Sequence, residues 1–195
     1  LINPKERLSV GDKLAAGDAI VLLASSGIHA NGVSLARKLV ERLPQGWLTA
    51  IDAMGTSFGD ALLAPTTLYS PVTEALWREG IAPHYCANIT GHGWRKLLRH
   101  PARLAYRIDV VPPVPRVLSF IAEHAGHDAR EAYSTFNMGA GFALFVAAQD
   151  AQRTVEVARA QGIEAWVAGR VEDGDKQLLI HPLGLRFGDD ALQLR

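Results

Sequence analysis

Cysteine is almost absent from this sequence, with Cys86 the only one among 195 residues. An internal disulfide and a cysteine-based metal site are therefore excluded, because each needs more than one thiol. The N-terminus also lacks the basic, apolar and small-residue regions of a signal peptide, and both observations favour a cytoplasmic location. No apolar run approaches the roughly 20 residues that cross a membrane as a helix, so no membrane partner is expected.

A surplus of charge is also lacking, because 20 Lys and Arg residues balance 20 Asp and Glu residues. A nucleic-acid partner is not expected, since such proteins normally show a basic surplus or stripe. The short basic cluster at residues 95–100 has helical spacing and is interpreted as a solvated helix face. Hydrophobic residues make up 48% of the chain, enough for a substantial core at this length.

Hydrophobic periodicity predicts a chain in which strands and helices interleave. Strands are predicted at residues 19–24, 84–89, 104–110, 142–147, 165–171 and 177–181. Helices are predicted from residue 31 to the stop at Pro44, within 57–80 with a break near Pro65, and at 94–100, 117–125 and 149–161, with helix or turn at 128–136. The expected fold class is α+β, a mixed β-sheet covered by helices.

Three local features sharpen this prediction. Asn31 or Ser34 should cap the first helix, because either side chain can accept from free first-turn amides. Pro71 should lie in the first turn of the helix after the break. The last two predicted strands flank the turn at residues 172–175 and are expected to form a hairpin.

Three segments repeat one design, in which a glycine-bearing loop joins a strand and a helix: residues 25–32, 88–93 and 135–141. Glycine lets backbone approach a ligand closely and adopt positive φ without steric cost. A helix that begins after such a loop directs free N–H groups at the site, which favours phosphate, and residues 90–93 fit this best. No Walker A or dinucleotide-binding fingerprint occurs, and a single glycine loop is a weak signal.

Histidines in two of these loops are candidates for chemistry. His29 and His92 could act as general acid or base, or bind phosphate when charged; the alternative is a structurally hydrogen-bonded or exposed imidazole. His124 and His127 at a helix end favour a polar surface cluster over a metal site, and no metal site is predicted. Ser25 and Ser26 are interpreted as turn hydroxyls, because no G-x-S-x-G elbow surrounds them.

Taken in order, five segments resemble motifs of AIR synthase, the phosphoribosylformylglycinamidine cyclo-ligase family. They are residues 25–38, which begin Ser-Ser-Gly-Ile-His, then 62–69, 89–93 with Ile-Thr-Gly-His-Gly, 135–141 with Thr-Phe-Asn-Met-Gly-Ala-Gly, and 168–171. The resemblance covers roughly residues 17–174 and corresponds only to the family's C-terminal domain. It implies that residues 17–195 form such a domain, and that residues 1–16 are a linker or lead-in from a missing N-terminal ATP-binding domain.

The resemblance also implies an activity. AIR synthase closes formylglycinamidine ribonucleotide to aminoimidazole ribonucleotide in purine biosynthesis: ATP phosphorylates the amide oxygen, and the amidine nitrogen then displaces phosphate. The family binds ATP and Mg²⁺ mainly on the N-terminal domain, which also forms the homodimer. The isolated chain is therefore expected to be inactive alone and to need its own N-terminal domain and a small ribonucleotide substrate.

By the same resemblance, particular residues are assigned to the site. His29, Asn31 and His92 are the catalytic candidates. The substrate- or phosphate-binding candidates are Ser26, Gly27, Asn88, Thr90, Gly91, Gly93, Asn137 and Gly139.

The sequence departs from the family at positions that bear on chemistry. Asn88 stands where the family usually has histidine, and an amide cannot exchange a proton near neutral pH. His92 replaces a glycine, while Thr67 and Ser134 stand where the family has arginine, and lost cations weaken recognition of a phosphate. Two alternatives therefore stay open: a paralogue that phosphorylates another small molecule, and a binding module without catalysis.

Overall fold

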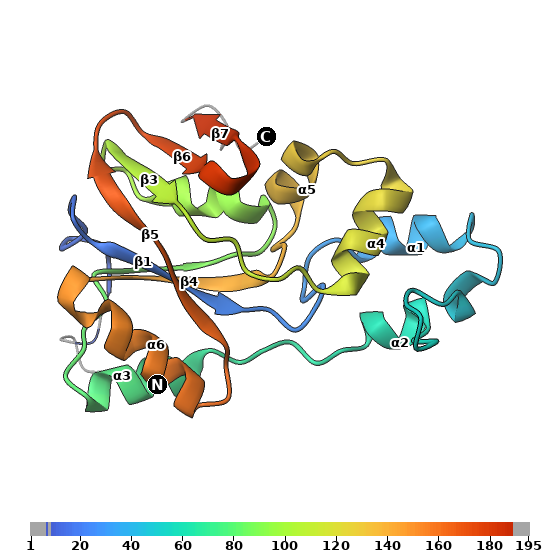
Figure 1. The fold of residues 1–195 in the computed structure, drawn as a ribbon, viewed down its shortest axis with the longest axis horizontal. Coiled ribbons are helices and arrows are strands. Elements are labelled where there is room, and N and C mark those ends of the chain that lie inside the picture. The colour runs from blue at the N-terminus through green and yellow to red at the C-terminus, as the bar shows by residue number, and fades with distance from the viewer. Residues whose placement is uncertain (1–6, 8, 189–195) are drawn as a thin grey trace.

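A single seven-stranded sheet organises the molecule (Figure 1), and its strand order is β2-β4-β1-β5-β3-β6-β7. The computed structural model describes residues 7 and 9–188. Parts of the predicted lead-in, residues 1–6 and 8, and the predicted domain end, 189–195, lie outside the described residues. All neighbouring strands pair antiparallel except β3 and β6, which are parallel. The sheet is therefore mixed, and the predicted α+β class is confirmed.

The elements follow the predicted order closely. The strands are β1 (Ala19–Ala24), β2 (Tyr85–Asn88), β3 (Leu104–Ile108), β4 (Ala140–Val146), β5 (Ala165–Asp173), β6 (Gln177–Ile180) and β7 (Leu185–Gly188). The α-helices are α1 (Val33–Val40), α2 (Phe58–Leu62), α3 (Ser70–Arg78), α4 (Arg116–Ala125), α5 (Ala129–Thr135) and α6 (Ala151–Ala160). Short 3₁₀ helices are η2 (Gly46–Leu48), η3 (Gly93–Arg99), η4 (Ala148–Asp150) and η5 (His181–Leu183).

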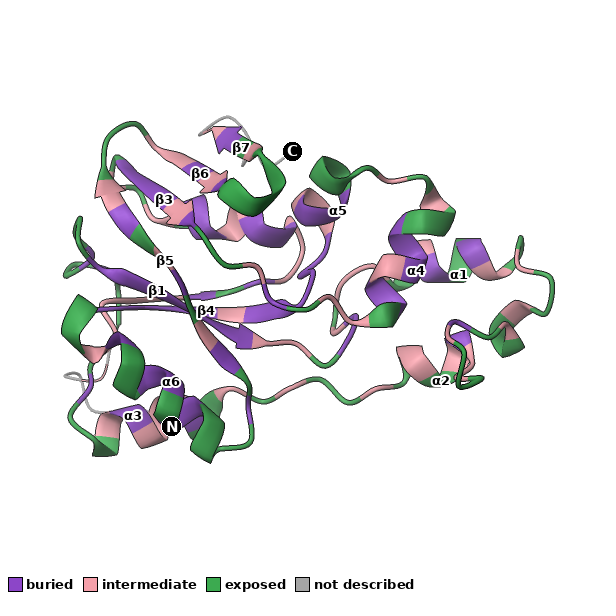
Figure 2. Cartoon of the chain, in the orientation of Figure 1, coloured by how far each residue is buried: buried purple, intermediate pink, exposed green. Residues whose placement is uncertain are grey.

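The two faces of the sheet bury separate hydrophobic clusters, as strand alternation requires. In β1, Ile20 and Leu22 join the larger cluster, whereas Val21 and Leu23 join the smaller one. Helices α3 and α6 cover the smaller cluster, and η3, α4 and α5 cover the larger one. Figure 2 shows the result, with buried residues along the strands and on the inward helix faces and exposed residues outside.

The predicted hairpin of the last two strands is wrong. Strand β3 lies between β5 and β6, antiparallel to the first and parallel to the second. The turn after residue 173 therefore crosses the end of β3 instead of joining neighbours. A third strand, β7, pairs with β6 at the sheet edge and was not predicted. Pairing between residues about 70 positions apart decided the arrangement, and local turn composition contains no information about it.

The predicted helix details had mixed outcomes. Pro71 lies in the first turn of α3, as expected. The predicted caps are wrong: Gly32 is the N-cap of α1, in the left-handed region, and no side chain caps that helix. The basic helix after the second glycine loop forms as 3₁₀ helix η3, not as an α-helix.

Residues 33–62 form an excursion from the sheet that holds α1, η2 and α2 (Figure 1). It is fastened to α4 by the buried Phe58, whose ring lies 5.2 Å from that of Phe120, and by Arg116, which donates to the Ile51 carbonyl at 2.7 Å. An extended stretch then returns the chain to α3 under the sheet. The excursion thus begins immediately after the first glycine loop.

Candidate functional site

The three glycine loops meet at one end of the sheet, and the strand pairing explains why. Loop 25–32 leaves the end of β1, loop 88–93 leaves the end of β2, and loop 135–141 leads into β4. Because β4 lies between β1 and β2 and is antiparallel to both, the ends of those strands flank its beginning. Segments more than 100 residues apart in sequence therefore share one site, which we call the loop cluster.

Asn137 holds two of these loops together from the inside. Asn137 is only 3% exposed. The Oδ1 atom accepts from Ser25 Oγ at 2.7 Å and from the Gly139 amide at 3.1 Å, while Nδ2 donates to the Gly27 carbonyl at 2.9 Å. Its own carbonyl accepts from the indole of Trp94 at 2.6 Å, and Trp94 directly follows the second loop. The buried amide thus bonds through both its oxygen and its nitrogen to backbone and side-chain groups of the loops.

The backbone of the cluster adopts conformations that side chains usually avoid. The non-glycine residues with positive φ among those described are His29 (54°), His92 (77°) and Met138 (43°), one in each loop. Such conformations cost of order 1–3 kcal/mol each and persist only where the surroundings enforce them. At Gly93, a Cβ would lie 2.3 Å from the Tyr133 carbonyl oxygen, so only glycine fits.

His29 is held as a neutral imidazole that accepts through Nε2. The Ser26 amide donates to Nε2 at 3.1 Å, while the Ser26 hydroxyl donates to the Pro65 carbonyl at 2.6 Å. Burial lowers the pKa of His29, which keeps the ring uncharged near neutral pH. The hydrogen bond assigns the proton to Nδ1, which leaves an N–H donor for a ligand.

Tyr69 supports this loop and was not singled out in the sequence. Its hydroxyl donates to the Ala24 carbonyl at 2.8 Å, and its ring stacks on Phe142 at 5.1 Å. A Cβ on Gly141 would collide with that hydroxyl at 1.9 Å and with the His29 ring at 2.9 Å. The glycine therefore makes room for both rings. In the sequence, only the position of Gly141 at the end of the Thr-Phe-Asn-Met-Gly-Ala-Gly motif indicated this close approach.

Asn31 joins the first and third loops instead of capping α1. Its Nδ2 donates to the Thr135 carbonyl, and its Oδ1 faces Gly91, where a Cβ would lie 3.5 Å away. The Asn31 amide does not cap the helix because it bonds to Thr135, more than 100 residues away in sequence. Asn31 and the second loop therefore border the same surface.

Two cations of η3, Arg95 and Lys96, turn toward the cluster, and the sequence had not predicted this orientation. Lys96 Nζ donates to Thr90 Oγ1 at 2.8 Å. Arg95 donates to the Ser134 carbonyl at 2.9 Å and to the His92 carbonyl at 3.3 Å. Their helical spacing was visible, but it was interpreted as a solvated face; in the structure only Arg99 of this group is exposed.

The predicted site residues divide into two groups by exposure. Those that reach the surface, fully or partly, are Ser26, His29, Asn31, Asn88, Thr90, Gly91 and His92. Those that are buried in the frame of the cluster are Gly27, Gly93, Asn137 and Gly139. Only the first group is placed to touch a ligand without rearrangement.

Other candidate groups lie outside the cluster. His124 Nδ1 lies 2.9 Å from the Phe120 carbonyl, and its ring stacks on that phenyl ring at 3.9 Å. Within residues 7 and 9–188, no group of three or more His, Cys, Asp and Glu side chains is placed to hold a metal ion. Across the same residues, no helix has the length and apolarity needed to span a membrane.

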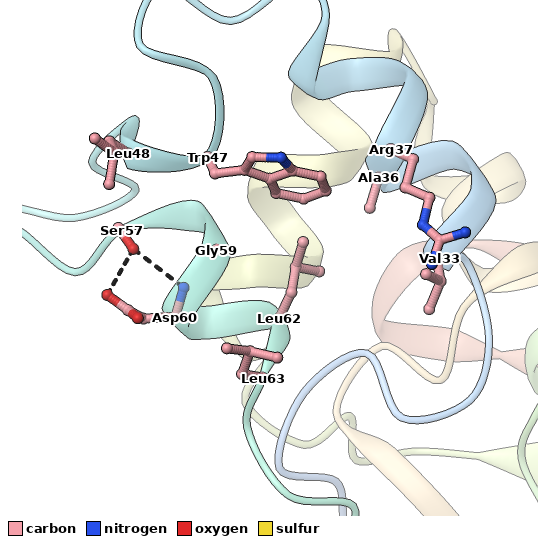
Figure 3. A pocket seen from close by; sticks show the side chains of 10 residues that line it. All are labelled: Val33, Ala36, Arg37, Trp47, Leu48, Ser57, Gly59, Asp60, Leu62 and Leu63. Atoms are coloured by element: carbon pink, nitrogen blue, oxygen red, sulfur yellow. Dashed lines mark hydrogen bonds between the residues drawn. The ribbon is translucent and has the colours of Figure 1, made fainter.

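An apolar groove of about 510 Å³ lies beside the cluster, between α1, η2 and α2 (Figure 3). It is lined mainly by Val33, Ala36, Trp47, Leu62 and Leu63. Its outer side chains are unusually open, with Trp47 45% and Leu63 80% exposed. Asp60 turns its carboxylate toward Ser57, whose hydroxyl donates to it at 2.6 Å (Figure 3).

Comparison with known sequences gives a family match over most of the chain. Residues 15–181 match the family described as AIR synthase related protein, C-terminal domain. A phosphoribosylformylglycinamidine cyclo-ligase of Methanococcus vannielii is 35% identical over 170 residues, covering 87% of this chain and 48% of that protein. The chain spans about half the length of the curated relatives it matches.

Two solved structures share the fold. The hydrogenase maturation protein HypE of E. coli superposes with a TM-score of 0.60 at 18% identity, over 98% of this chain and 55% of that one. PurL of T. maritima, complexed with ATP, gives a TM-score of 0.53 at 14% identity, over 96% of this chain and 27% of that one. Identities this low establish a shared architecture and nothing about chemistry.

Proposed function

The chain belongs to the AIR synthase related family through that family's C-terminal domain, and on this premise we propose that it is the C-terminal half of an ATP-dependent cyclo-ligase. The proposed reaction converts formylglycinamidine ribonucleotide to aminoimidazole ribonucleotide in purine biosynthesis. The relatives named as cyclo-ligases support it. The observation that carries the proposal is the loop cluster, because three of the five segments that carry the resemblance form it.

The described residues do not suit Mg²⁺–ATP by themselves. Magnesium prefers carboxylate oxygens together with phosphate, and residues 7 and 9–188 offer no group of three acidic or imidazole ligands. We therefore propose that an N-terminal half binds ATP and Mg²⁺ and closes the site against the loop cluster. A homodimer and a cytoplasmic location belong to the same proposal. PurL, which shares the fold, was solved with ATP.

Within this proposal the loop cluster binds and orients the ribonucleotide. The Nδ1–H of His29 donates to the substrate, because Nε2 is already engaged by Ser26. Asn31 presents Oδ1 beside Gly91 and can accept from a substrate N–H group. Proton transfer through His29 would require release of Nε2 from Ser26, so its first role is positioning and hydrogen bonding.

The proposal is tested in the full-length protein in which this chain is the C-terminal half. ATP hydrolysis should be stimulated by formylglycinamidine ribonucleotide, and His29→Ala should lower kcat/KM about a hundredfold or more, because a positioned group is lost. His124→Ala is the matched control, since its imidazole bonds only within α4. Unchanged turnover in His29→Ala would remove His29 from the site.

The same assay separates the alternatives left open by Asn88 and His92. A folded, ATP-binding protein without stimulation by this ribonucleotide would favour a paralogue that phosphorylates another small molecule. Absence of ATP binding by the full-length protein would favour a binding module without catalysis.

A further inference from the structure

Lys96 is one of two cations of η3 that contact the second glycine loop. The rotation of η3 is set by Trp94, Leu97 and Leu98, which are fully buried in the larger cluster. That rotation directs Lys96 back over Thr90 and leaves Arg99 exposed on the outer side. Arg95 is engaged with backbone carbonyls, so Lys96 is the ammonium next to the accessible part of the loop.

The charge of Lys96 is not compensated by the protein around it. Within residues 7 and 9–188, its hydrogen-bond partner is the neutral Thr90 hydroxyl, and no carboxylate forms an ion pair with it. An ammonium has three N–H donors, and one hydroxyl occupies one of them. Partial burial, and then the neighbouring Arg99, lower the pKa of Lys96, as expected for a cation that lacks an anion.

The groups around this ammonium form a short continuous strip. Thr90 is bonded to Lys96, Gly91 follows it in the chain, and Asn31 Oδ1 lies against Gly91. Thr90 and Gly91 are partly exposed, so a ligand can reach them. A point charge with further N–H donors, beside a hydroxyl that can also donate, suits a compact oxyanion with several acceptor oxygens. Asn31 Oδ1 is an acceptor, so it borders the strip without binding the oxyanion.

We propose that Lys96, oriented by Thr90, binds a phosphate group at the second glycine loop and selects phosphorylated ligands. The inference rests on the proposed function for the identity of the substrate, where the group would be the phosphate monoester of the ribonucleotide. A nucleoside triphosphate carries phosphate groups of the same kind, and a comparison of ribose 5-phosphate with ATP separates the two sources.

The test titrates the chain with ribose 5-phosphate, ribose and ATP, followed by amide chemical shifts of residues 88–93. Ribose 5-phosphate should bind and ribose should not. Lys96→Gln should weaken binding of ribose 5-phosphate about ten- to a hundredfold, the range expected for a charge-assisted hydrogen bond. Lys96→Arg, which keeps the charge, should restore most of it. Stronger Lys96-dependent binding of ATP than of ribose 5-phosphate would assign the site to the nucleotide.

Arg99→Gln is the matched control, because it removes one charge from the same helix on the exposed side. An equal loss in Arg99→Gln and Lys96→Gln, or no Lys96-dependent binding of either phosphate ligand, would overturn the inference. A Lys96→Gln chain with wild-type thermal stability and weaker binding excludes a purely structural role. If phosphate binding depends on Lys96 while the full-length protein lacks cyclo-ligase turnover, the proposed function fails and this inference stands.

Discussion

The loop cluster and the apolar groove lie side by side, yet different kinds of interaction fix them. Backbone carbonyls, buried amides and left-handed residues fix the loop cluster, with Asn137 at its centre. Apolar side chains shape most of the groove, with Trp47 stacked on Phe58 at 6.3 Å. Gly32 ends the first loop of the cluster, close to the Phe136 ring, and Val33 lines the groove, so one short segment belongs to both regions.

The two regions should therefore differ in the substitutions that they tolerate. A site fixed by backbone geometry tolerates almost no added atoms, because carbonyl oxygens cannot move aside cheaply. A groove formed by side chains on short helices tolerates changes at its rim but not at its base, where burial supplies the stability.

Phe58→Ala should destabilise the chain by about 4 kcal/mol, the usual cost of removing a fully buried phenyl ring. Phe58 is 0% exposed and lies between the rings of Trp47 and Phe120. Urea denaturation measures the change. Leu63→Ala, at 80% exposure on the groove rim, should stay within about 0.5 kcal/mol of wild type. Similar costs for both variants would contradict the division between base and rim.

Gly93→Ala should cost about 3 kcal/mol, because it adds a left-handed penalty to a steric one. The φ of Gly93 is +54°, and the new Cβ would lie 2.3 Å from the Tyr133 carbonyl oxygen. Gly126→Ala is the matched control: its φ is +70°, and nothing lies within 4 Å of the added Cβ. It should cost about 1 kcal/mol. Equal losses in thermal denaturation would show that close packing of the loops contributes nothing.

The smallest effect concerns the pH dependence of stability through His29. Burial lowers its folded-state pKa below the ordinary 6.5, so the unfolded chain binds a proton first as pH falls. Stability from this group is therefore present above pH 6.5 and is lost as pH falls below that value. His29→Gln should flatten this slope of the unfolding free energy. An NMR titration of the His29 ring with a midpoint above 6.5 would refute the burial argument.

Local sequence patterns predicted most elements but not their partners. The central strands β1 and β4 and the helices α4 and α6 lie close to their predicted ranges, because apolar periodicity reports a buried face directly. The hairpin prediction was wrong because β3 lies between β5 and β6. The insertion of a strand that is distant in sequence leaves no signal in the local residues. The cap on α1 failed because Asn31 found a tertiary partner at Thr135.

The sequence predicted the loops of the candidate site but not which of their residues are exposed to a ligand. Glycine spacing marked all three loops, since positive φ and close approach require glycine locally. Which residues face a ligand was not predictable: Asn137 and Gly93 are buried, while Lys96 turns inward from a helix interpreted as solvated. The direction of η3 depends on how Trp94 packs, and that is a property of the assembled core.

Residues near one another in the chain specify the central apolar strands, the buried faces of α4 and α6 and the three glycine loops, and these features were predictable for that reason. The tertiary structure decided that the loops share one end of the sheet, that Asn137 binds them together and that Lys96 lies over Thr90. The contacts of Asn137 join segments that only strand pairing brings together, whereas the Lys96–Thr90 contact is close in sequence but depends on how η3 packs in the core. Hydrogen-bond partners and burial are set there, and no local pattern specifies them.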